Sequence, residues 1–395
     1  MAERVFLHVA TPKSGTTYLQ TVLWRNAAEL RRADLLLPGR FQLHYAAAKS
    51  VTDQAQMRQV TQKTDDVWPR LTRQINKWPG AALISHELFA PATVEQSTQA
   101  KAALANAETH LILTARALHK QIPAAWQQGV RGGLAQPFDR YLMSLRTGTG
   151  KASWFWSVQD LADIAERWGS DLPPERIHIV TVPLDASKPG ELWQRYAPVL
   201  GIDPNSCDID VPRKNPSVGA VEAELMRRVH ARGDTRISEQ RRFSPWSRRL
   251  LVGKVLGERS GAPFVPPDDA REWIEERTAA MVHQIRERGY HVVGDLADLD
   301  WQAPPPGART IGSVTEDEIH DLCGWTIGRL QEELVHRLPA VPPPAVAPSD
   351  GIDGILELLE HIRAADTGAQ PRPASTPSPS RRLIQRVRRL VSVVR

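Results

Sequence analysis

Apolar runs of strand length alternate with helical segments over the first 200 residues, and this alternation restricts the folds that the chain can adopt. The four runs are residues 4–10, 81–86, 109–115 and 176–182. The segments between them place apolar residues at the three- and four-residue spacing of a helix face. Helices are therefore expected at about residues 16–30, 54–78, 97–107, 119–130, 137–145, 153–168 and 189–200. Strands that alternate with helices predict an α/β fold, in which a central parallel sheet is flanked by helices on both faces.

The pattern changes further along the chain, and this change suggests where the folded body ends. Helical periodicity dominates over residues 216–289 and again over 315–337. A proline-rich segment at 339–348 is typical of an extended linker. We therefore expect one α/β body over residues 1–335, and a linker with a C-terminal tail over residues 336–395.

The tail differs from the body in charge. The chain carries +5 in total, but seven arginines and no acid lie in residues 371–395, which leaves −2 for the rest. A basic body that binds nucleic acid is therefore not expected. From Arg381 onward, apolar residues and arginines fall on opposite sides of a helical wheel. This basic amphipathic helix is a candidate for peripheral contact with an anionic membrane or a protein partner. The alternatives are that it packs on the body or stays disordered, as the Pro- and Ser-rich segment 368–380 is expected to be.

Several classes of protein are excluded by what the sequence lacks. Cys207 and Cys323 are too few for a disulfide framework or a four-cysteine zinc site. HExxH and CxxC motifs are absent, so no metal is expected. The sequence also lacks an apolar stretch of about 20 residues, as a membrane-spanning helix needs, and the N-terminus lacks the apolar core of a signal peptide. The expected location is therefore cytoplasmic.

The segment between the first strand and the first helix, residues 11–17 (TPKSGTT), has the composition of an anion-binding loop. The N–H groups at a helix N-terminus are unpaired and carry a partial positive charge, so they bind phosphate. Gly15 allows the backbone to approach an anion closely. Thr16 and Thr17 add hydroxyls, and Lys13 adds a cation. Open α/β sheets place their ligands at this end of the strands.

Two common nucleotide-binding motifs do not fit this loop. A Walker A loop would need a glycine at the position of Ala10 and a lysine at the position of Thr16. A GxGxxG dinucleotide motif is also absent. An ordinary nucleoside-triphosphate hydrolase is therefore disfavoured.

The run from Pro12 to Thr17, with Leu19 two residues further on, resembles the 5′-phosphosulfate loop of sulfotransferases. These enzymes use 3′-phosphoadenosine 5′-phosphosulfate (PAPS). The resemblance implies the P-loop-like sulfotransferase fold for the body, with PAPS as co-substrate and no metal. It implies that Lys13 neutralises the charge that develops on the bridging oxygen as sulfate leaves. It further implies a set of residues that bind the 5′-phosphosulfate: Ser14, Gly15, Thr16 and Thr17.

The same resemblance points to a site for the 3′-phosphate of the nucleotide. In this family an arginine after a later strand binds it, together with a serine shortly after. Arg116 directly follows the strand at 109–115 and matches the arginine, whereas Ala124 stands where the serine is expected. Lys120 and Gln127 are the alternatives for that second contact.

A basic loop at residues 211–217 (VPRKNPS) resembles, loosely, the loop that closes over the 3′-phosphate in many sulfotransferases. The resemblance makes Arg213 and Ser217 candidate ligands of the nucleotide. The alternative is an ordinary solvated loop before a helix.

Transfer to a hydroxyl benefits from a base that takes the acceptor's proton. Glu87 directly follows the strand at 81–86 and resembles the catalytic glutamate of carbohydrate and protein-tyrosine sulfotransferases. His86 is the rival, since histidine is the base in the small-molecule enzymes. Side chains alternate along a strand, so at most one of the two is expected to face the site. Neither does so if Glu87 caps the next element and His86 lies in the core.

The resemblance implies a sulfotransferase that moves a sulfuryl group from PAPS to a hydroxyl of a glycan, a glycolipid or a small molecule. Two alternatives stay open. One is a nucleotide-dependent kinase with a variant phosphate loop, and the other is a non-catalytic protein of this fold that acts through its basic tail. The sequence does not identify the acceptor. The aromatic residues at 154–156 either line its pocket or belong to the core.

Overall fold

The computed structural model describes residues 2–52, 67–104, 107–150, 152–185, 188–211, 218–232, 248–259, 261–337 and 344–367. By its contacts the chain divides into two compact units. The sheet unit comprises Met1–Ala223 and Ser260–Ser313, and the helical unit comprises Glu224–Arg259 and Val314–Arg395. The division into a functional body over residues 1–335 and a tail over residues 336–395 stays a prediction. The predicted linker lies partly outside the described residues, and the basic helix from residue 381 lies wholly outside them.

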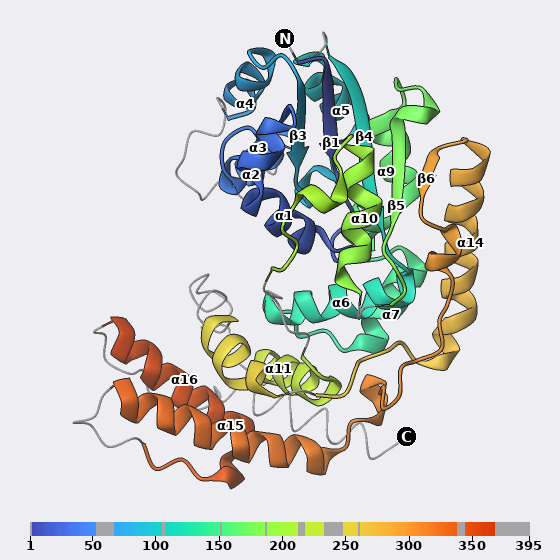
Figure 1. The fold of residues 1–395 in the computed structure, drawn as a ribbon. Coiled ribbons are helices and arrows are strands. Elements are labelled where there is room, and N and C mark those ends of the chain that lie inside the picture. The colour runs from blue at the N-terminus through green and yellow to red at the C-terminus, as the bar shows by residue number, and fades with distance from the viewer. Residues whose placement is uncertain are drawn as a thin grey trace. The chain divides into compact units, whose positions relative to one another are not determined.

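The sheet unit is built on six parallel strands (Figure 1). They are β1 (Arg4–His8), β2 (Leu35–Leu36), β3 (Ala81–Ser85), β4 (Glu108–Ala115), β5 (Ile177–Thr181) and β6 (His291–Val293). Their order is β2-β3-β1-β4-β5-β6, so the chain passes from β1 to the edge strand β2, returns to β3 beside β1, and then adds β4, β5 and β6 on the other side. The predicted α/β fold with a central parallel sheet is therefore confirmed. The carboxyl ends of β1 and β4 flank the point where the winding reverses, which is where such sheets bind ligands.

Most helices of the sheet unit lie where the sequence pattern predicts them. The helix expected from residue 16 to about residue 30 is divided, because the Asn26 side chain donates to the carbonyls of Val22 and Asp208, at 2.8 Å each. The structure adds β2 and α3, which the pattern did not indicate. The described helices are α1 (Thr16–Arg25), α2 (Ala27–Arg32), α3 (Phe41–Val51), α4 (Val67–Asn76), α5 (Val94–Ala102), α6 (Leu118–Arg131), α7 (Phe138–Thr147), α8 (Ala152–Gln159), α9 (Leu161–Gly169), α10 (Pro189–Val199) and α14 (Arg271–Glu287).

Helices cover both faces of the sheet. On one face, α1 and α10 enclose a core in which Phe6 of β1 is buried with Leu23 and Trp193. On the other face, α9 packs so closely that a Cβ added to Gly169 would lie 2.3 Å from Cδ1 of Ile177 in β5. Because both faces are covered, β3 and β5 are wholly buried, as expected for a parallel sheet, whereas the edge strand β6 is partly exposed.

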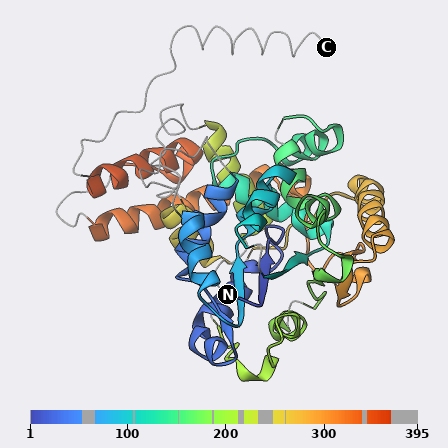
Figure 2. The same ribbon diagram turned by 90° about the horizontal axis from the view of Figure 1, so that it is seen from above.

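The helical unit is held together partly by ion pairs between its helices. Arg228 pairs with Glu316 and Arg232 pairs with Asp353, both at 2.7 Å. Figures 1 and 2 both show the last two helices side by side. The described elements are α11 (Ala220–Arg232, which begins in the sheet unit), a π-helical segment (Arg248–Val255), α15 (Glu316–Arg337) and α16 (Gly351–Thr367).

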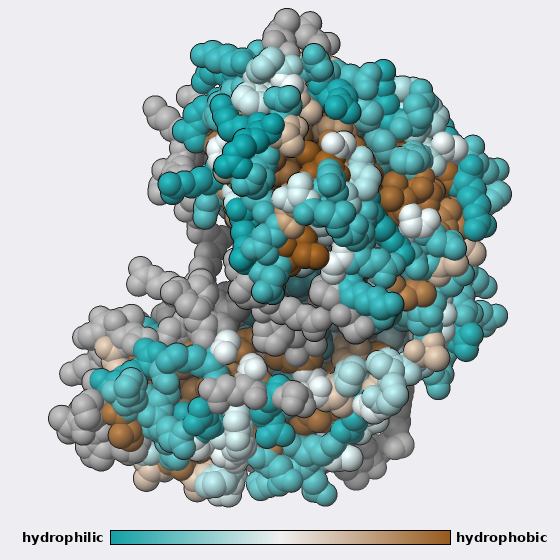
Figure 3. Space-filling model, in the orientation of Figure 1, coloured by the Kyte–Doolittle hydropathy of each residue, from teal (hydrophilic) through white to brown (hydrophobic). Residues whose placement is uncertain are grey.

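The surface is mixed in character. On the face drawn in Figure 3, hydrophilic residues predominate and apolar residues show in small separate patches. Within the described ranges, the helices are all too short or too polar to cross a lipid bilayer.

Candidate functional site

The loop between β1 and α1 has an unusual backbone. Ala10, Lys13 and Gly15 have positive φ angles of 49°, 69° and 84°. Positive φ is strained for residues other than glycine, and such strain persists only where the surroundings hold the backbone firmly. A Cβ at Gly15 would also lie 2.4 Å from Cδ2 of Leu192 in α10, so the Leu192 side chain would have to shift. This position, the N-cap of α1, therefore requires glycine.

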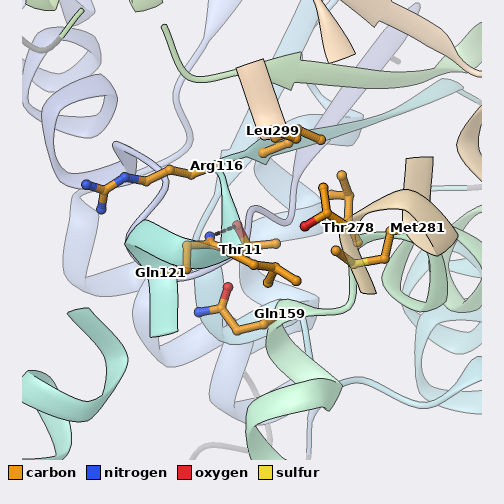
Figure 4. Close-up of a pocket in the computed structure, with 10 residues that line it drawn as sticks. Thr11, Arg116, Gln121, Gln159, Thr278, Met281 and Leu299 are labelled. Atoms are coloured by element: carbon orange, nitrogen blue, oxygen red, sulfur yellow. Dashed lines mark hydrogen bonds between the residues drawn. The ribbon is translucent and has the colours of Figure 1, made fainter. Parts of the chain in front are cut away.

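Interior side chains hold the carbonyl groups of this loop. The Ser14 hydroxyl donates to Thr11 O at 2.5 Å. The side-chain amides of Gln121 on α6 and Gln159 on α8 both donate to Pro12 O, at 3.3 and 3.1 Å. Figure 4 shows both amides beside Thr11, to whose Oγ1 Gln121 also donates at 2.8 Å. The acceptors of the loop are thus turned toward the protein interior.

The N–H groups at the start of α1, in contrast to these carbonyls, lack hydrogen-bond partners among the described residues. Leu19 is the first residue of the helix whose N–H reaches a backbone acceptor, Gly15 O at 3.1 Å. The N–H groups of Gly15, Thr16, Thr17 and Tyr18 have no backbone acceptor among the described residues, and no side chain caps them. A helix N-terminus in this state binds anions. The predicted loop residues Ser14 to Thr17 thus lie at this helix end. The Thr17 side chain is exposed and that of Thr16 is buried.

Lys13 and Arg116 follow the neighbouring strands β1 and β4 and contact each other at this loop. Arg116, the first residue after β4, donates from Nη1 to Lys13 O at 3.1 Å. The Lys13 ammonium donates to Oε1 of Gln128 on α6 at 2.9 Å. Burial lowers the pKa of Arg116 from its ordinary value. Two cations thus lie beside the uncapped end of α1.

Lys120 and Gln127, the two alternatives for the second contact, differ in their neighbours. The pKa of Lys120 is lowered by burial and then by the positive charge of Arg116, which indicates that the two cations are close. Gln127 instead donates from Nε2 to Val218 O at 3.0 Å. The structure adds no hydroxyl at Ala124, the position where the resemblance expects one. Arg213 and Ser217 lie outside the described residues.

A small cavity lies behind the loop. It is lined by Thr11, Gln121 and Gln159 and, on the far side, by Thr278 and Met281 of α14 (Figure 4). Its volume of about 10 Å³ is room for a single water molecule and far too small for a nucleotide. The side chain of Arg116 points away from Thr278 and Met281.

His86 and Glu87 follow β3 at the same edge of the sheet, and their environments differ. His86 is buried, and its Nδ1 accepts from Leu88 N–H at 3.0 Å. Burial lowers the pKa of His86, so its imidazole is neutral and carries its proton on Nε2. The Glu87 side chain is 30% exposed, and its Oε2 has no hydrogen-bond partner among the described residues. This Oε2 is itself buried and lies 3.8 Å from Nδ1 of His86, so Glu87 keeps an acceptor without a hydrogen bond, whereas the acceptor nitrogen of His86 is used.

Aromatic side chains of α3 cover His86. The rings of Phe41 and Tyr45 lie 5.4 Å from the His86 ring, centroid to centroid. Both are partly exposed, at 37% and 40%. The sequence held a usable signal for this helix, because Phe41 and Tyr45 stand four residues apart and so share one face.

The aromatic run after residue 153 divides between surface and core. Trp154 is half-exposed, whereas Phe155 is buried. Trp156 is partly buried and donates from Nε1 to Leu145 O at 3.2 Å. Trp154, Phe155 and Trp156 therefore do not lie on one common surface that could line an acceptor pocket.

The residues that hold the loop from behind were not among the predicted ones. Gln121, Gln128 and Gln159 carry no motif, and their partners lie more than 100 residues away in the chain. Thr114 of β4 contacts the Ser14 hydroxyl at 2.5 Å and was likewise not predicted. Only the three-dimensional fold brings such residues to the loop.

Comparison with known proteins adds little to this geometry. No protein-family model and no curated protein sequence matches the chain. A similar solved structure is that of a sulfotransferase from Alicyclobacillus acidocaldarius, which is 16% identical with a TM-score of 0.37. The match covers 65% of this chain and 99% of that one. The likeness is one of fold, and at this identity and score it carries no argument about the site.

Proposed function

We propose that this chain is a PAPS-dependent sulfotransferase that sulfates a hydroxyl group of its acceptor. The loop after β1 carries the proposal. Its carbonyls are held by interior side chains, the N–H groups of residues 15–18 lack backbone acceptors in the part of the chain that the structure describes, and Lys13 and Arg116 lie beside them. Such a site suits a ligand with several negative charges. The sequence of the loop resembles the 5′-phosphosulfate loop of this family.

In the proposed reaction, the acceptor oxygen attacks the sulfur of PAPS in line with the leaving oxygen. A new O–S bond forms, the S–O bond to the 5′-phosphate breaks, and adenosine 3′,5′-bisphosphate departs. The Lys13 ammonium would exchange Gln128 for the leaving oxygen, where negative charge develops. The protein thus acts through positioning and charge stabilisation, as in phosphoryl transfer.

Glu87 is the proposed base. Its buried oxygen Oε2 has no hydrogen-bond partner among the described residues, whereas the only hydrogen-free nitrogen of neutral His86 already accepts from Leu88 N–H. Glu87 would take the proton of the acceptor hydroxyl as the O–S bond forms.

Arg116 is the proposed ligand of the 3′-phosphate, with Lys120 as its neighbour. A guanidinium has five N–H donors, so the hydrogen bond to Lys13 O leaves others for a phosphate. Arg213 and Ser217 remain proposed ligands from the loop at 211–217.

The proposal is tested by incubating the protein with PAPS carrying labelled sulfate, and a cell extract as the source of acceptors. Products that gain one SO₃ unit are then identified by mass spectrometry. Transfer that proceeds without magnesium is expected. Phosphate transfer from ATP with magnesium would instead support a kinase. Tight binding of adenosine 3′,5′-bisphosphate without turnover on any acceptor would support a non-catalytic protein.

A further inference from the structure

A chain of hydrogen bonds runs beneath the loop from β1. His8, the last residue of β1, is fully buried, and its Nε2 lies 3.5 Å from Oγ1 of Thr114 on β4. Thr114 Oγ1 lies 2.5 Å from the Ser14 hydroxyl, which in turn donates to Thr11 O at 2.5 Å. Each of these side chains is shielded from water, so their polar atoms depend on one another.

The direction of these bonds follows from their last member. Thr11 O can only accept, so the Ser14 hydroxyl donates its single proton to Thr11 O. Thr114 must therefore donate to Ser14, and His8 must donate to Thr114 from Nε2. A neutral imidazole carries one proton, so Nδ1 of His8 is left as an acceptor.

The other side of His8 fits this assignment. Ser85, the last residue of β3, lies with its Oγ 2.8 Å from His8 Nδ1 and so donates to it. Gln20 of α1 donates from Nε2 to Ser85 Oγ at 3.4 Å. The chain thus runs in one direction from α1, through β3, β1 and β4, to the loop.

We propose that His8, as a neutral Nε2–H imidazole, is a positioning residue that holds the anion-binding loop in register with β3, the strand that leads to Glu87. Its Nε2 side supports Ser14 and Thr11, and its Nδ1 side engages Ser85. Burial, with a smaller effect of nearby His86, lowers the pKa of His8 to about 3. The imidazole therefore stays neutral throughout the range in which the protein would work.

The strained loop gives His8 its importance. Ala10 and Lys13 keep positive φ angles although neither is glycine. Backbone of this kind needs external support. The hydrogen bonds at Thr11, between those two residues, and at Ser14, directly after Lys13, provide it. Loss of the Thr114 link is expected to let the loop relax away from the conformation that directs its N–H groups at the anion.

Variants of Thr114 test the loop side of the chain by titration with adenosine 3′,5′-bisphosphate, so this arm rests on the proposed function. Thr114→Val has the same shape without the hydroxyl and should weaken binding at least tenfold, about the effect of one buried hydrogen bond. Thr114→Ser keeps the hydroxyl and should stay within about threefold of the unmodified chain. Thr109→Val, at the other end of β4, is the matched control and should not change affinity.

Two variants of His8 separate positioning from a merely structural role. In His8→Gln the amide reaches the Nε2 position and can still donate to Thr114, whereas in His8→Asn it reaches only the Nδ1 position. We expect His8→Gln to bind the nucleotide at least tenfold more tightly than His8→Asn, at similar thermal stability. Equal affinities, or a Thr114→Val variant that binds normally, would overturn the proposal.

A second measurement does not depend on the proposed function. Imidazole ¹⁵N spectra of the full chain, with the His8 signal assigned by its loss in His8→Asn, report the tautomer directly. An Nε2–H imidazole that stays neutral from pH 8 to pH 5 is expected. An Nδ1–H imidazole, or protonation above pH 5, would overturn the inference even if the nucleotide binds. Absence of nucleotide binding with the expected tautomer would count against the enzyme assignment alone.

Discussion

Lys13 illustrates how much of the account depends on single side chains. Its ammonium rests on Gln128, at the edge of the loop predicted to hold phosphosulfate. Lys13→Ala should lower turnover about 100- to 1,000-fold, as removal of one charge-stabilising donor does in other enzymes. The circular dichroism spectrum and melting temperature should be unchanged, since the side chain is partly exposed. Steady-state kinetics with PAPS measures the effect. Lys77→Ala, at an exposed surface position, is the control, and normal turnover of Lys13→Ala would remove Lys13 from the mechanism.

The choice between Glu87 and His86 is also settled at the level of residues. Glu87→Gln keeps the shape of the side chain but cannot take a proton, so kcat should fall at least about 100-fold. Affinity for adenosine 3′,5′-bisphosphate should stay the same, because Glu87 is assigned to the acceptor. Glu95→Gln, an exposed carboxylate on α5, serves as the comparison. If kcat survives in Glu87→Gln, the base lies elsewhere.

At the scale of elements, buried histidines make the stability of the sheet unit sensitive to acid. His44 on α3 donates from Nε2 to Pro38 O and accepts from Ser85 N–H, so it is fully paired while neutral. Burial lowers its pKa to about 4, and that of His178 on β5 also to about 4. The unfolded chain binds these protons near pH 6.5, before the folded one does. Stability is therefore complete above pH 6.5 and is lost as the pH falls toward 4.

The expected loss for each of these two histidines is about 3 kcal/mol down to pH 4, of which about 2 kcal/mol falls between pH 7 and pH 5. Urea unfolding at pH 7, 6 and 5 measures it. His44→Gln should lower stability at pH 7 and flatten its dependence on pH, whereas His283→Gln, with a side chain 71% exposed, should leave that dependence unchanged. A free energy of unfolding that is constant from pH 7 to pH 5 would contradict the assignment of neutral buried histidines.

The elements themselves were largely predictable from the sequence, and the reasons are local. β1, β3, β4 and β5 are short apolar runs bounded by polar or turn residues, and α1 begins at Thr16, as expected. β2 was missed because two residues carry no periodicity. The division of α1 from α2 was missed because it depends on Asn26 reaching Asp208, a contact between distant parts of the chain.

The sequence predicted the anion-binding loop of the candidate site but not the residues that support that loop. Residues 12–17 are contiguous, so their pattern is visible in the sequence. The supports of the loop, such as His8 with Thr114 or Pro12 with Gln159, join residues that are 106 and 147 positions apart. These pairs form only through tertiary packing, so no short sequence motif predicts them.

At the scale of the whole molecule, the tail and the site are expected to act separately. The chain's positive net charge comes from arginines after residue 371, outside the described residues, whereas the proposed site belongs to the sheet unit. Removal of residues 370–395 should abolish binding to anionic vesicles while sulfate transfer remains intact. Vesicle sedimentation with the full chain and the truncated chain checks this. Unchanged sedimentation of the truncated chain would refute a membrane role of the tail.

The claim that the turn after β1 holds a nucleotide is tested most directly by calorimetric titration with adenosine 3′,5′-bisphosphate in the absence of magnesium. The account predicts one binding site per chain, which Gly15→Ala weakens at least about 100-fold, because alanine is strained at a φ of 84° and its Cβ would also displace the Leu192 side chain. Gly148→Ala should leave the site intact, since Gly148 also has a positive φ but open space around it. No heat of binding from the unmodified chain, or equal binding by Gly15→Ala, would contradict the account.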